Sequence, residues 1–335
     1  MGQRGIVAQV RTNRFPSKTL NCKSARIQFL VLDESSRIKA PDAQITRFFI
    51  GSPSGRGPSS FADKVPYKLI LSGTPAPNTP MEYWSQMRFL DPHVLGDNYY
   101  AFKNQYFYTP FQGSYLWKLR TGSEERLMDL VKGNAFFISK EECLDLPDKI
   151  FTAREYEMDK LQKQAYQDMK RENILELMDK TILGVTEVAK LMKLRQITSG
   201  FIFDNQGSPT YISDGKFKLL RETLGEIDRK RQVIIWCQFR FEIKRIKSFL
   251  GEEACCLYGD TAQSEKEAAI RDFVEGRKRY LIAHPKSGGV GLTFVNCSYN
   301  IYFSLDYSYE AFKQSQDRTH RIGQEKKVTY IFLLA

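Results

Sequence analysis

Short apolar runs recur along the chain, and amphipathic stretches of helical length separate the later ones. Runs of strand length lie at residues 27–32, 67–72, 233–236, 254–257, 280–283 and 299–303. The stretches with helical spacing between the later runs lie at residues 216–227, 241–250 and 264–273. Strands that alternate with helices are typical of a parallel sheet with both faces covered. The pattern therefore predicts an α/β fold, most clearly after residue 200.

The middle of the chain has a helical pattern instead. Residues 158–198 combine many charges with regularly spaced apolar positions, which predicts helices that end near Gly200. Further upstream, Thr79-Pro80 has the form of a helix start. Trp84 and Met87 follow at helical spacing, so we expect both side chains in a hydrophobic core.

Two regions before residue 120 lack a regular period. Residues 51–60 are rich in glycine, proline and serine, which predicts a surface loop. Residues 97–117 hold the densest run of aromatic side chains, with Lys103 and Lys118 among them. Aromatic residues interleaved with lysine can stack on bases and contact phosphates, but packing in a core is the favoured interpretation.

Two adjacent carboxylates directly follow the first apolar run. Asp33 and Glu34 stand at the carboxyl end of the predicted strand 27–32, and ligands bind at this edge of open α/β sheets. An aspartate there can hold a magnesium ion through its water shell, while the adjacent glutamate takes a proton from an attacking water. A polar turn after a strand can have the same sequence, so the pair alone leaves both interpretations open.

Residues 314–324, Gln-Ser-Gln-Asp-Arg-Thr-His-Arg-Ile-Gly-Gln, hold two arginines three positions apart. We expect Arg318 and Arg321 on one face of a short helix, with Gln314 one turn earlier on the same face. Guanidinium groups match the geometry of phosphate oxygens, so this face could reach a nucleotide triphosphate across a cleft. A solvated basic helix end is the alternative for the segment taken alone.

Six segments, in the same order, resemble the motifs of the Swi/Snf-like branch of superfamily-two helicases and DNA translocases. Residues 33–36 (Asp-Glu-Ser-Ser) resemble motif II, and residues 71–75 (Leu-Ser-Gly-Thr-Pro) resemble motif III. Residues 194–200 resemble the segment that joins the family's two lobes, and residues 233–238 resemble the strand of motif IV. Residues 287–292 resemble motif V, and residues 314–324 resemble motif VI. Six matches in register are hard to obtain by chance.

The resemblance implies two RecA-like lobes with parallel sheets, the cofactors ATP and Mg²⁺ in a cleft between them, and double- or single-stranded DNA as partner. The implied catalytic residues are Asp33, Glu34, Arg318 and Arg321, with Asp33 holding Mg²⁺ through water. The implied nucleotide contacts are Gln314, Gly289 and Gly291. The residues implied to couple the nucleotide site to nucleic acid are Ser72, Thr74, Ser287, Gly288 and Gln238. Asn296 and Asp306 are further polar contacts that the resemblance suggests.

Two departures from the family's pattern change this picture. Ser35 and Ser36 follow the acidic pair where the family usually has Ala-His, and this form indicates a compact bacterial or phage member. No Gly-x-x-x-x-Gly-Lys-Ser/Thr phosphate loop occurs in the sequence, and the only Gly-Lys pair, Gly215-Lys216, lacks the hydroxyl residue after it. We therefore expect an N-terminally truncated fragment that hydrolyses ATP negligibly alone, unless an upstream segment or a separate chain supplies the loop.

Composition adds few constraints. A net charge of +11 and a pI near 9.2 favour a polyanionic partner. The six cysteines contain no Cys-x-x-Cys pair, and with only three histidines no zinc site is predicted. No apolar run approaches the roughly 18–20 residues of a membrane-spanning helix. We expect no membrane partner and a location in the cytoplasm of a bacterial or phage-infected cell.

The order of the motifs predicts three regions. Residues 1–95 would form the C-terminal part of an incomplete first lobe, residues 96–200 a helical insertion and linker, and residues 201–335 the second lobe. The predicted function is part of an ATP-dependent DNA helicase or translocase. The alternative is a non-catalytic DNA-binding or regulatory fragment, although such a fragment has no chemical reason to keep the acidic pair and both arginines.

Overall fold

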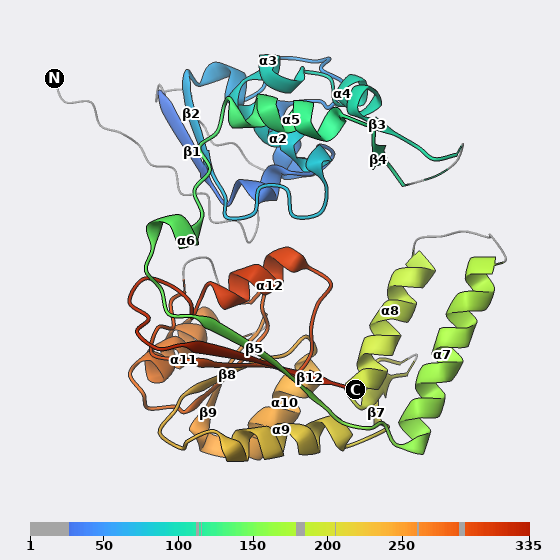
Figure 1. The fold of residues 1–335 in the computed structure, drawn as a ribbon, viewed down its shortest axis with the longest axis vertical. Coiled ribbons are helices and arrows are strands. Elements are labelled where there is room, and N and C mark those ends of the chain that lie inside the picture. Colours follow the sequence, from blue (N-terminus) through green and yellow to red (C-terminus); the bar gives the residue numbers. More distant parts are fainter. Residues whose placement is uncertain are drawn as a thin grey trace. The chain divides into compact units, whose positions relative to one another are not determined.

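The computed structural model describes residues 27–111, 114, 116–178, 185–204, 206–259, 261–287 and 292–335, without the side chains of 141 and 172–188. The chain divides into two compact units, Met1–Ser139 and Lys140–Ala335 (Figure 1). Both contain parallel strands and helices, which confirms the predicted α/β class. The three regions predicted from the motif order, 1–95, 96–200 and 201–335, do not coincide with these two units and stay a prediction.

The first unit contains a pair of parallel strands packed against helices. β1 (Phe29–Asp33) pairs with β2 (Tyr67–Leu71), and Asp33 lies opposite Leu71, so the two carboxyl ends share one edge. The helical elements are η1 (Ser35–Ile38), α1 (Gln44–Ile50), η2 (Ala62–Lys64), η3 (Pro80–Glu82), α2 (Tyr83–Leu90), α3 (Pro92–Leu95), α4 (Tyr99–Tyr106) and α5 (Ser123–Lys132). The remaining strands, β3 (Phe107–Tyr108) and β4 (Lys118–Leu119), form a short antiparallel pair.

The core of the first unit is largely aromatic. Trp84 and Met87 of α2 are buried in it, as the helical spacing predicts. The aromatic stretch contributes Phe102, Tyr106 and Phe107, all of them buried in the same core. Packing is therefore the confirmed role of these three side chains.

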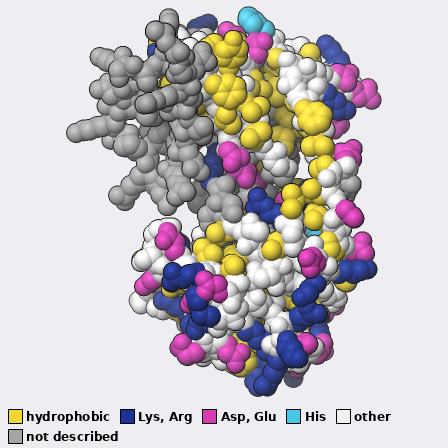
Figure 2. All heavy atoms as spheres, turned by 90° about the vertical axis from the view of Figure 1, so that its left-hand side faces the viewer, with side chains coloured by type: hydrophobic (Ala, Val, Ile, Leu, Met, Phe, Trp, Pro, Cys, Tyr) yellow, Lys and Arg dark blue, Asp and Glu magenta, His cyan; other side chains and the backbone are white. Residues whose placement is uncertain are grey.

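One face of the β1–β2 pair is apolar and exposed. Phe29, Tyr67, Leu69 and Leu71 occupy alternate positions of the two paired strands and are between 42% and 65% exposed. Figure 2 views the molecule from the side on which β1 and β2 lie in Figure 1, and hydrophobic side chains gather on this face of the first unit. Parallel sheets in α/β proteins are usually covered on both faces, so an exposed apolar face is unusual for such a strand pair.

The second unit is built around a six-stranded sheet, entirely parallel, in the order β5-β12-β11-β8-β10-β9. Its strands are β5 (Lys149–Glu155), β8 (Val233–Trp236), β9 (Ala254–Leu257), β10 (Tyr280–Ala283), β11 (Tyr299–Tyr302) and β12 (Val328–Leu334). The predicted runs coincide with β8, β9 and β10 and exceed β11 by one residue. β5, at one edge of the sheet, was not predicted.

Helices cover both faces of this sheet. Val233 and Ile235 of β8 point into the core formed with α9 (Gly215–Glu226) and α10 (Arg240–Leu250). Ile234 and Trp236 point to the opposite side, into the core formed with α11 (Gln263–Val274) and α12 (Tyr309–Gln316). Burial on both faces explains why this strand is apolar at every position.

Two long helices lie between β5 and the rest of the sheet in the sequence. α7 (Lys160–Met178) and α8 (Val185–Thr198) pack against each other, and α6 (Lys140–Cys143) precedes β5 (Figure 1). α8 ends just before Gly200, whose φ of +84° ends the helix as predicted. β6 (Phe201–Phe203) and β7 (Pro209–Tyr211) then form an antiparallel pair. Within the described residues, every helix is too short or too polar to cross a membrane.

Candidate nucleotide and nucleic-acid site

The acidic pair lies at the carboxyl end of β1 in an unusual backbone conformation. Asp33 is exposed, and its Oδ1 accepts a hydrogen bond from the Glu34 amide at 3.0 Å. Glu34 has φ 55° and ψ 54°, and it is the only residue other than glycine with a positive φ in the described part of the chain. This left-handed conformation costs an L-residue about 1–2 kcal/mol, and such residues concentrate at functional sites. The acidic pair therefore differs from an ordinary polar turn.

The predicted motif III residues lie at the same edge of the strand pair. Ser72 follows β2 directly, and its Oγ accepts a hydrogen bond from the Thr74 amide at 3.2 Å. Because β1 and β2 are parallel and Asp33 is in register with Leu71, the chain leaves both strands on one side. The structure thus brings the two predicted segments of the first unit, 33–34 and 72–74, to a common edge.

The prediction that Arg318 and Arg321 lie on a helix is wrong. α12 contains Gln314 but ends at Gln316, so Arg318 and Arg321 follow it in a series of turns. Arg318 is buried, at 8% exposure, whereas Arg321 is exposed. The two side chains therefore do not share a helix face with Gln314.

Tertiary contacts account for the early end of α12. The Arg318 carbonyl accepts a hydrogen bond from the Phe294 amide at 2.7 Å, which draws the backbone toward the segment after motif V. Gln324 is buried, and its side-chain amide donates to the carbonyls of Cys297 and Thr319 at 3.0 and 3.1 Å. Arg321 in turn donates from Nη1 to Thr293 Oγ1 at 3.2 Å. The arginine segment is thus tied to residues 293–297 and is not free to continue the helix.

A polar network lies at the carboxyl ends of β8 and β11. The Gln238 amide donates to Ser304 Oγ at 2.8 Å. Asp306 receives Lys286 Nζ at 2.9 Å and Arg195 Nη1 at 3.3 Å. The network therefore joins α8, which carries Arg195, to Lys286, the residue just before Ser287. Arg195 and Lys286 were not among the predicted site residues, although Arg195 lies within the inter-lobe segment.

Two titratable groups of this network have shifted pKa values. Burial lowers the pKa of His284, and the positive charge of Lys286 lowers it further. Burial opposes ionisation of Asp306, but the hydrogen bond and charge of Lys286 hold the pKa of Asp306 below its ordinary value. At neutral pH this edge of the sheet thus carries a neutral imidazole beside an ionised carboxylate.

The remaining predicted residues are placed differently. Gly288, Gly289 and Gly291 lie outside the described residues. Asn296 donates to Gln232 Oε1 at 2.7 Å, and Gln232 immediately precedes β8, so Asn296 lies at the amino end of that strand. Among the residues that the structure describes, no group of three or more His, Cys, Asp or Glu side chains could hold a metal ion.

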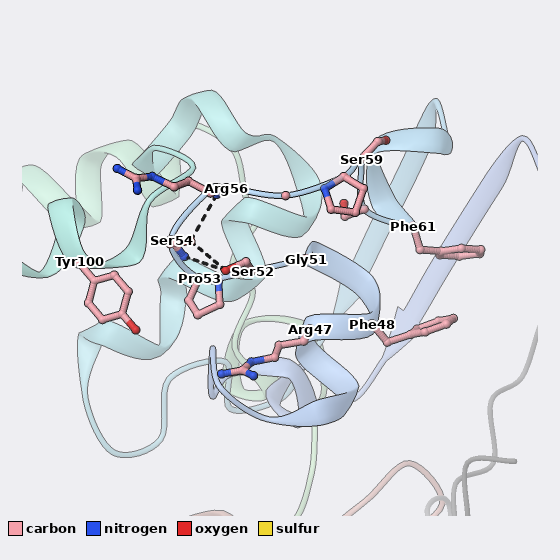
Figure 3. A pocket seen from close by; sticks show the side chains of 13 residues that line it. Arg47, Phe48, Gly51, Ser52, Pro53, Ser54, Arg56, Ser59, Phe61 and Tyr100 are labelled. Carbon is pink, nitrogen blue, oxygen red and sulfur yellow. Dashed lines mark hydrogen bonds between the residues drawn. The ribbon is translucent and has the colours of Figure 1, made fainter. Parts of the chain in front are cut away.

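A hollow of about 550 Å³ lies on another part of the first unit. It is lined by residues of the loop predicted at 51–60 together with Arg47 and Tyr100, and Figure 3 shows the side chains of Arg47, Arg56 and Tyr100 around it. Ser54 Oγ accepts the Arg56 amide at 3.4 Å, so the loop is held by turns without a helix or strand. The lining includes none of the predicted site residues. The hollow is thus separate from the acidic edge.

The parallel sheets and the helices packed on them place the chain among α/β proteins. The chain belongs to the SNF2-related family: the model of the SNF2-related domain matches residues 11–199. The model of the helicase conserved C-terminal domain matches residues 215–323. The resemblance to the Swi/Snf-like branch of superfamily-two helicases is thereby confirmed.

The chain is similar in sequence to individual curated proteins and to a solved structure. The transcription regulatory protein SNF2 of Saccharomyces cerevisiae is 28% identical over 297 residues, which cover 80% of this chain and 17% of the yeast protein. The uncharacterized ATP-dependent helicase MG018 of Mycoplasma genitalium is 24% identical over 319 residues, covering 92% of this chain and 28% of that protein. The chain thus spans less than a third of the length of either relative. The solved SWI2/SNF2 ATPase core of Sulfolobus solfataricus in complex with double-stranded DNA is 26% identical, with a TM-score of 0.44, and the match covers 95% of this chain and 65% of that one.

Proposed function

We propose that this chain is the motif II to motif VI part of an ATP-dependent DNA translocase or helicase. The observation that carries the proposal is the strained acidic pair, Asp33 and Glu34, at the carboxyl edge that it shares with Ser72 and Thr74. Membership of the SNF2-related family supports ATP as the nucleotide and DNA as the polymer. Hydrolysis at the acidic edge would drive movement along DNA or separation of its strands.

The acidic edge suits the handling of a magnesium nucleotide. The Asp33 carboxylate is exposed, and carboxylate oxygens are ligands that Mg²⁺ accepts directly or through water. Asp33 would hold the hydrated ion, which neutralises charge on the phosphates when bound. The carboxylate of Glu34, the next residue, would accept the proton of the attacking water. The hydrogen bond from the Glu34 amide to Asp33 Oδ1 orients the Asp33 carboxylate at this edge.

Arg318 and Arg321 would stabilise negative charge on the transferred phosphoryl group. An arginine in this role is worth roughly 10³–10⁵ in rate. Arg321 is exposed, and its bond to Thr293 ties it to the segment after motif V. The nucleotide contacts would come from Gln314, Gly289 and Gly291. The coupling contacts to DNA would come from Ser72, Thr74, Ser287, Gly288 and Gln238.

The phosphate loop that this chemistry requires would come from a further segment, in cis or from a separate chain. The exposed apolar face formed by Phe29, Tyr67, Leu69 and Leu71 supports this part of the proposal. A segment that adds strands beside β1 and β2 and covers that face would also bring backbone amides and a lysine to the acidic edge. Without such a segment, we expect negligible ATP hydrolysis by this chain.

Glu34→Gln tests the motor assignment in a protein that carries this chain together with its phosphate-loop segment. The variant keeps the size and backbone of Glu34 but cannot accept the proton, so phosphate release stimulated by DNA should fall by about 10²–10⁴-fold. Binding of ATP, followed with a fluorescent analogue, should persist. Unchanged phosphate release in the variant would refute the motor assignment and favour the non-catalytic DNA-binding alternative.

The bacterial or phage source indicated by Ser35-Ser36 and the cytoplasmic location stay predictions. The matching relatives include eukaryotic chromatin proteins as well as mycoplasma helicases.

A further inference from the structure

Gln86 connects the two loops that carry the proposed catalytic and coupling residues of the first unit. It lies on α2 and is fully buried, at 0% exposure. Its Oε1 accepts a hydrogen bond from Ser35 Oγ at 2.7 Å. Its Nε2 donates to the carbonyl of Pro75 at 2.5 Å and to the carbonyl of Glu82 at 2.9 Å. Ser35 directly follows Glu34, and Pro75 directly follows Thr74.

The hydrogen-bond partners fix the orientation of the Gln86 amide. A carbonyl can only accept, so the nitrogen must face Pro75 and Glu82 and the oxygen must face Ser35. Both amide hydrogens are then used, and the Ser35 hydroxyl must donate. Rotation of the amide would place an oxygen against two carbonyls in a buried site, which is costly. Gln86 is therefore locked in one arrangement as long as both loops keep their positions.

Other contacts of α2 strengthen the same connection. Ser85 Oγ donates to the Lys39 carbonyl at 3.3 Å, at the end of η1. The Glu82 carboxylate accepts the amide and the side-chain nitrogen of Asn78 at 3.1 and 2.7 Å, in the loop after Pro75. The first turns of α2 thus hold residues 35–39 on one side and residues 75–78 on the other. Among the described hydrogen bonds, the Gln86 side chain is the one that bonds to both loops; Glu82 reaches residues 35–39 only through an ion pair with Lys39 at 3.8 Å.

We propose that Gln86 is a positioning residue that couples the place of Glu34 to the place of the 72–75 loop. If DNA shifts that loop, the Pro75 carbonyl moves, the amide must follow, and the bond to Ser35 changes with it. Through the Ser35 backbone, this displacement reaches Glu34, which stands in a strained conformation that a small shift can alter. DNA binding at the 72–75 loop would thereby align the base for hydrolysis. The inference rests on the proposed function and deepens it.

A double-variant design separates coupling from mere packing. The four forms are the wild type, Gln86→Leu, Ser35→Ala and Ser35→Ala/Gln86→Leu, in a protein that also carries the phosphate-loop segment. Loss of one partner leaves a buried polar group unsatisfied, whereas replacing both by apolar groups can be nearly neutral. The double variant should therefore have a higher urea midpoint than Gln86→Leu alone, because it no longer contains a Ser35 hydroxyl without an acceptor, whereas the Pro75 and Glu82 carbonyls lack the Gln86 donor in both forms. DNA stimulation of phosphate release should stay about 3- to 30-fold below wild type in both forms that carry Gln86→Leu.

Trp84→Phe is the matched control on the same helix. It removes the partly buried hydrogen bond from Trp84 Nε1 to the Gly96 carbonyl, 3.0 Å long, which reaches neither loop. This variant should lower the urea midpoint and leave the DNA stimulation unchanged. A double variant with full DNA stimulation would overturn the coupling role of Gln86. A wild-type protein whose phosphate release does not respond to DNA would overturn the proposed function itself, and the coupling role with it.

Discussion

The backbone strain at Glu34 predicts an inverted order of stability for two small substitutions. Glu34→Ala and Glu34→Gly both remove the carboxylate, so the interactions of that group cancel when the two variants are compared. Alanine must keep the left-handed conformation, φ 55° and ψ 54°, at a cost of about 1–2 kcal/mol. Glycine adopts it freely but loses about 0.4–1 kcal/mol through its more flexible unfolded state. The glycine variant should therefore be more stable by about 0.8 kcal/mol, the difference between the midpoints of these two ranges.

Urea denaturation followed by tryptophan fluorescence measures this difference. Trp84 is fully buried in the core of the first unit and reports on its unfolding. Gly122→Ala is a calibration in the same unit, because Gly122 has φ 71° and a Cβ there would meet no atom within 4 Å. Its cost gives the penalty of the left-handed conformation alone. If Glu34→Gly proved no more stable than Glu34→Ala, the strained conformation would not exist in solution. The inference of a built functional strain would then fail.

Three further outcomes follow from the structure. Gly200→Ala should destabilise the second unit by about 2–5 kcal/mol in urea denaturation, because its positive φ is strained for alanine and the new Cβ would lie 2.2 Å from the Ser213 carbonyl oxygen. Gly207 has a positive φ but open space around it, so Gly207→Ala should cost only about 1–2 kcal/mol. Equal losses of stability in the two variants would contradict the close approach at Gly200. Burial lowers the pKa of His284 and of His320 in the folded protein. The unfolded chain therefore binds more protons than the folded protein as pH falls through about 6.5, and the urea midpoint should be lower at pH 5 than at pH 7. A midpoint that rises on acidification would show that the two pKa values are shifted in the opposite direction. DNA affinity, measured by fluorescence anisotropy, should fall steeply between 50 and 200 mM salt if phosphate contacts dominate, whereas a flat dependence would assign the +11 charge to solubility.

The parts of the fold that the sequence predicts best are those with purely local signals. Val233–Trp236 is apolar at every position because helices cover both of its sides, so its extent is readable from four adjacent residues. The position of Asp33 and Glu34 at a strand end follows from the abrupt change of polarity after Leu32. The end of α8 follows from Gly200, because glycine adopts the required positive φ without strain.

The parts that the sequence does not predict depend on distant partners. β5 has the sequence Lys-Ile-Phe-Thr-Ala-Arg-Glu and is mostly exposed, so it lacks the apolar run of a buried strand. The spacing of Arg318 and Arg321 fits a helix, but the segment instead makes tertiary hydrogen bonds to Thr293, Phe294 and Cys297. The sequence of residues 314–324 does not predict those contacts.

Gln86 illustrates a third kind of difficulty. It lies between Trp84 and Met87, and the spacing of that segment predicts core residues. A polar side chain at such a position signals a buried partner, but the partners, Ser35 and Pro75, lie in other segments. Sequence alone marks the position as unusual and cannot say what it binds.

The pairing of β5 with β12 sets the order in which the second unit can be completed. Lys149 pairs with Val328 and Glu155 with Leu334, and every other strand of the sheet lies between them in the sequence. During synthesis, β5 leaves the ribosome long before β12, its neighbour in the sheet of the described residues, has been made. Closing such a long loop carries an entropic cost and slows folding. The strand β5 therefore stays unpaired in the nascent chain until β12 has been synthesised. Its lysine, arginine and glutamate protect it from aggregation during this time, because charged side chains on an unpaired strand oppose pairing with other chains.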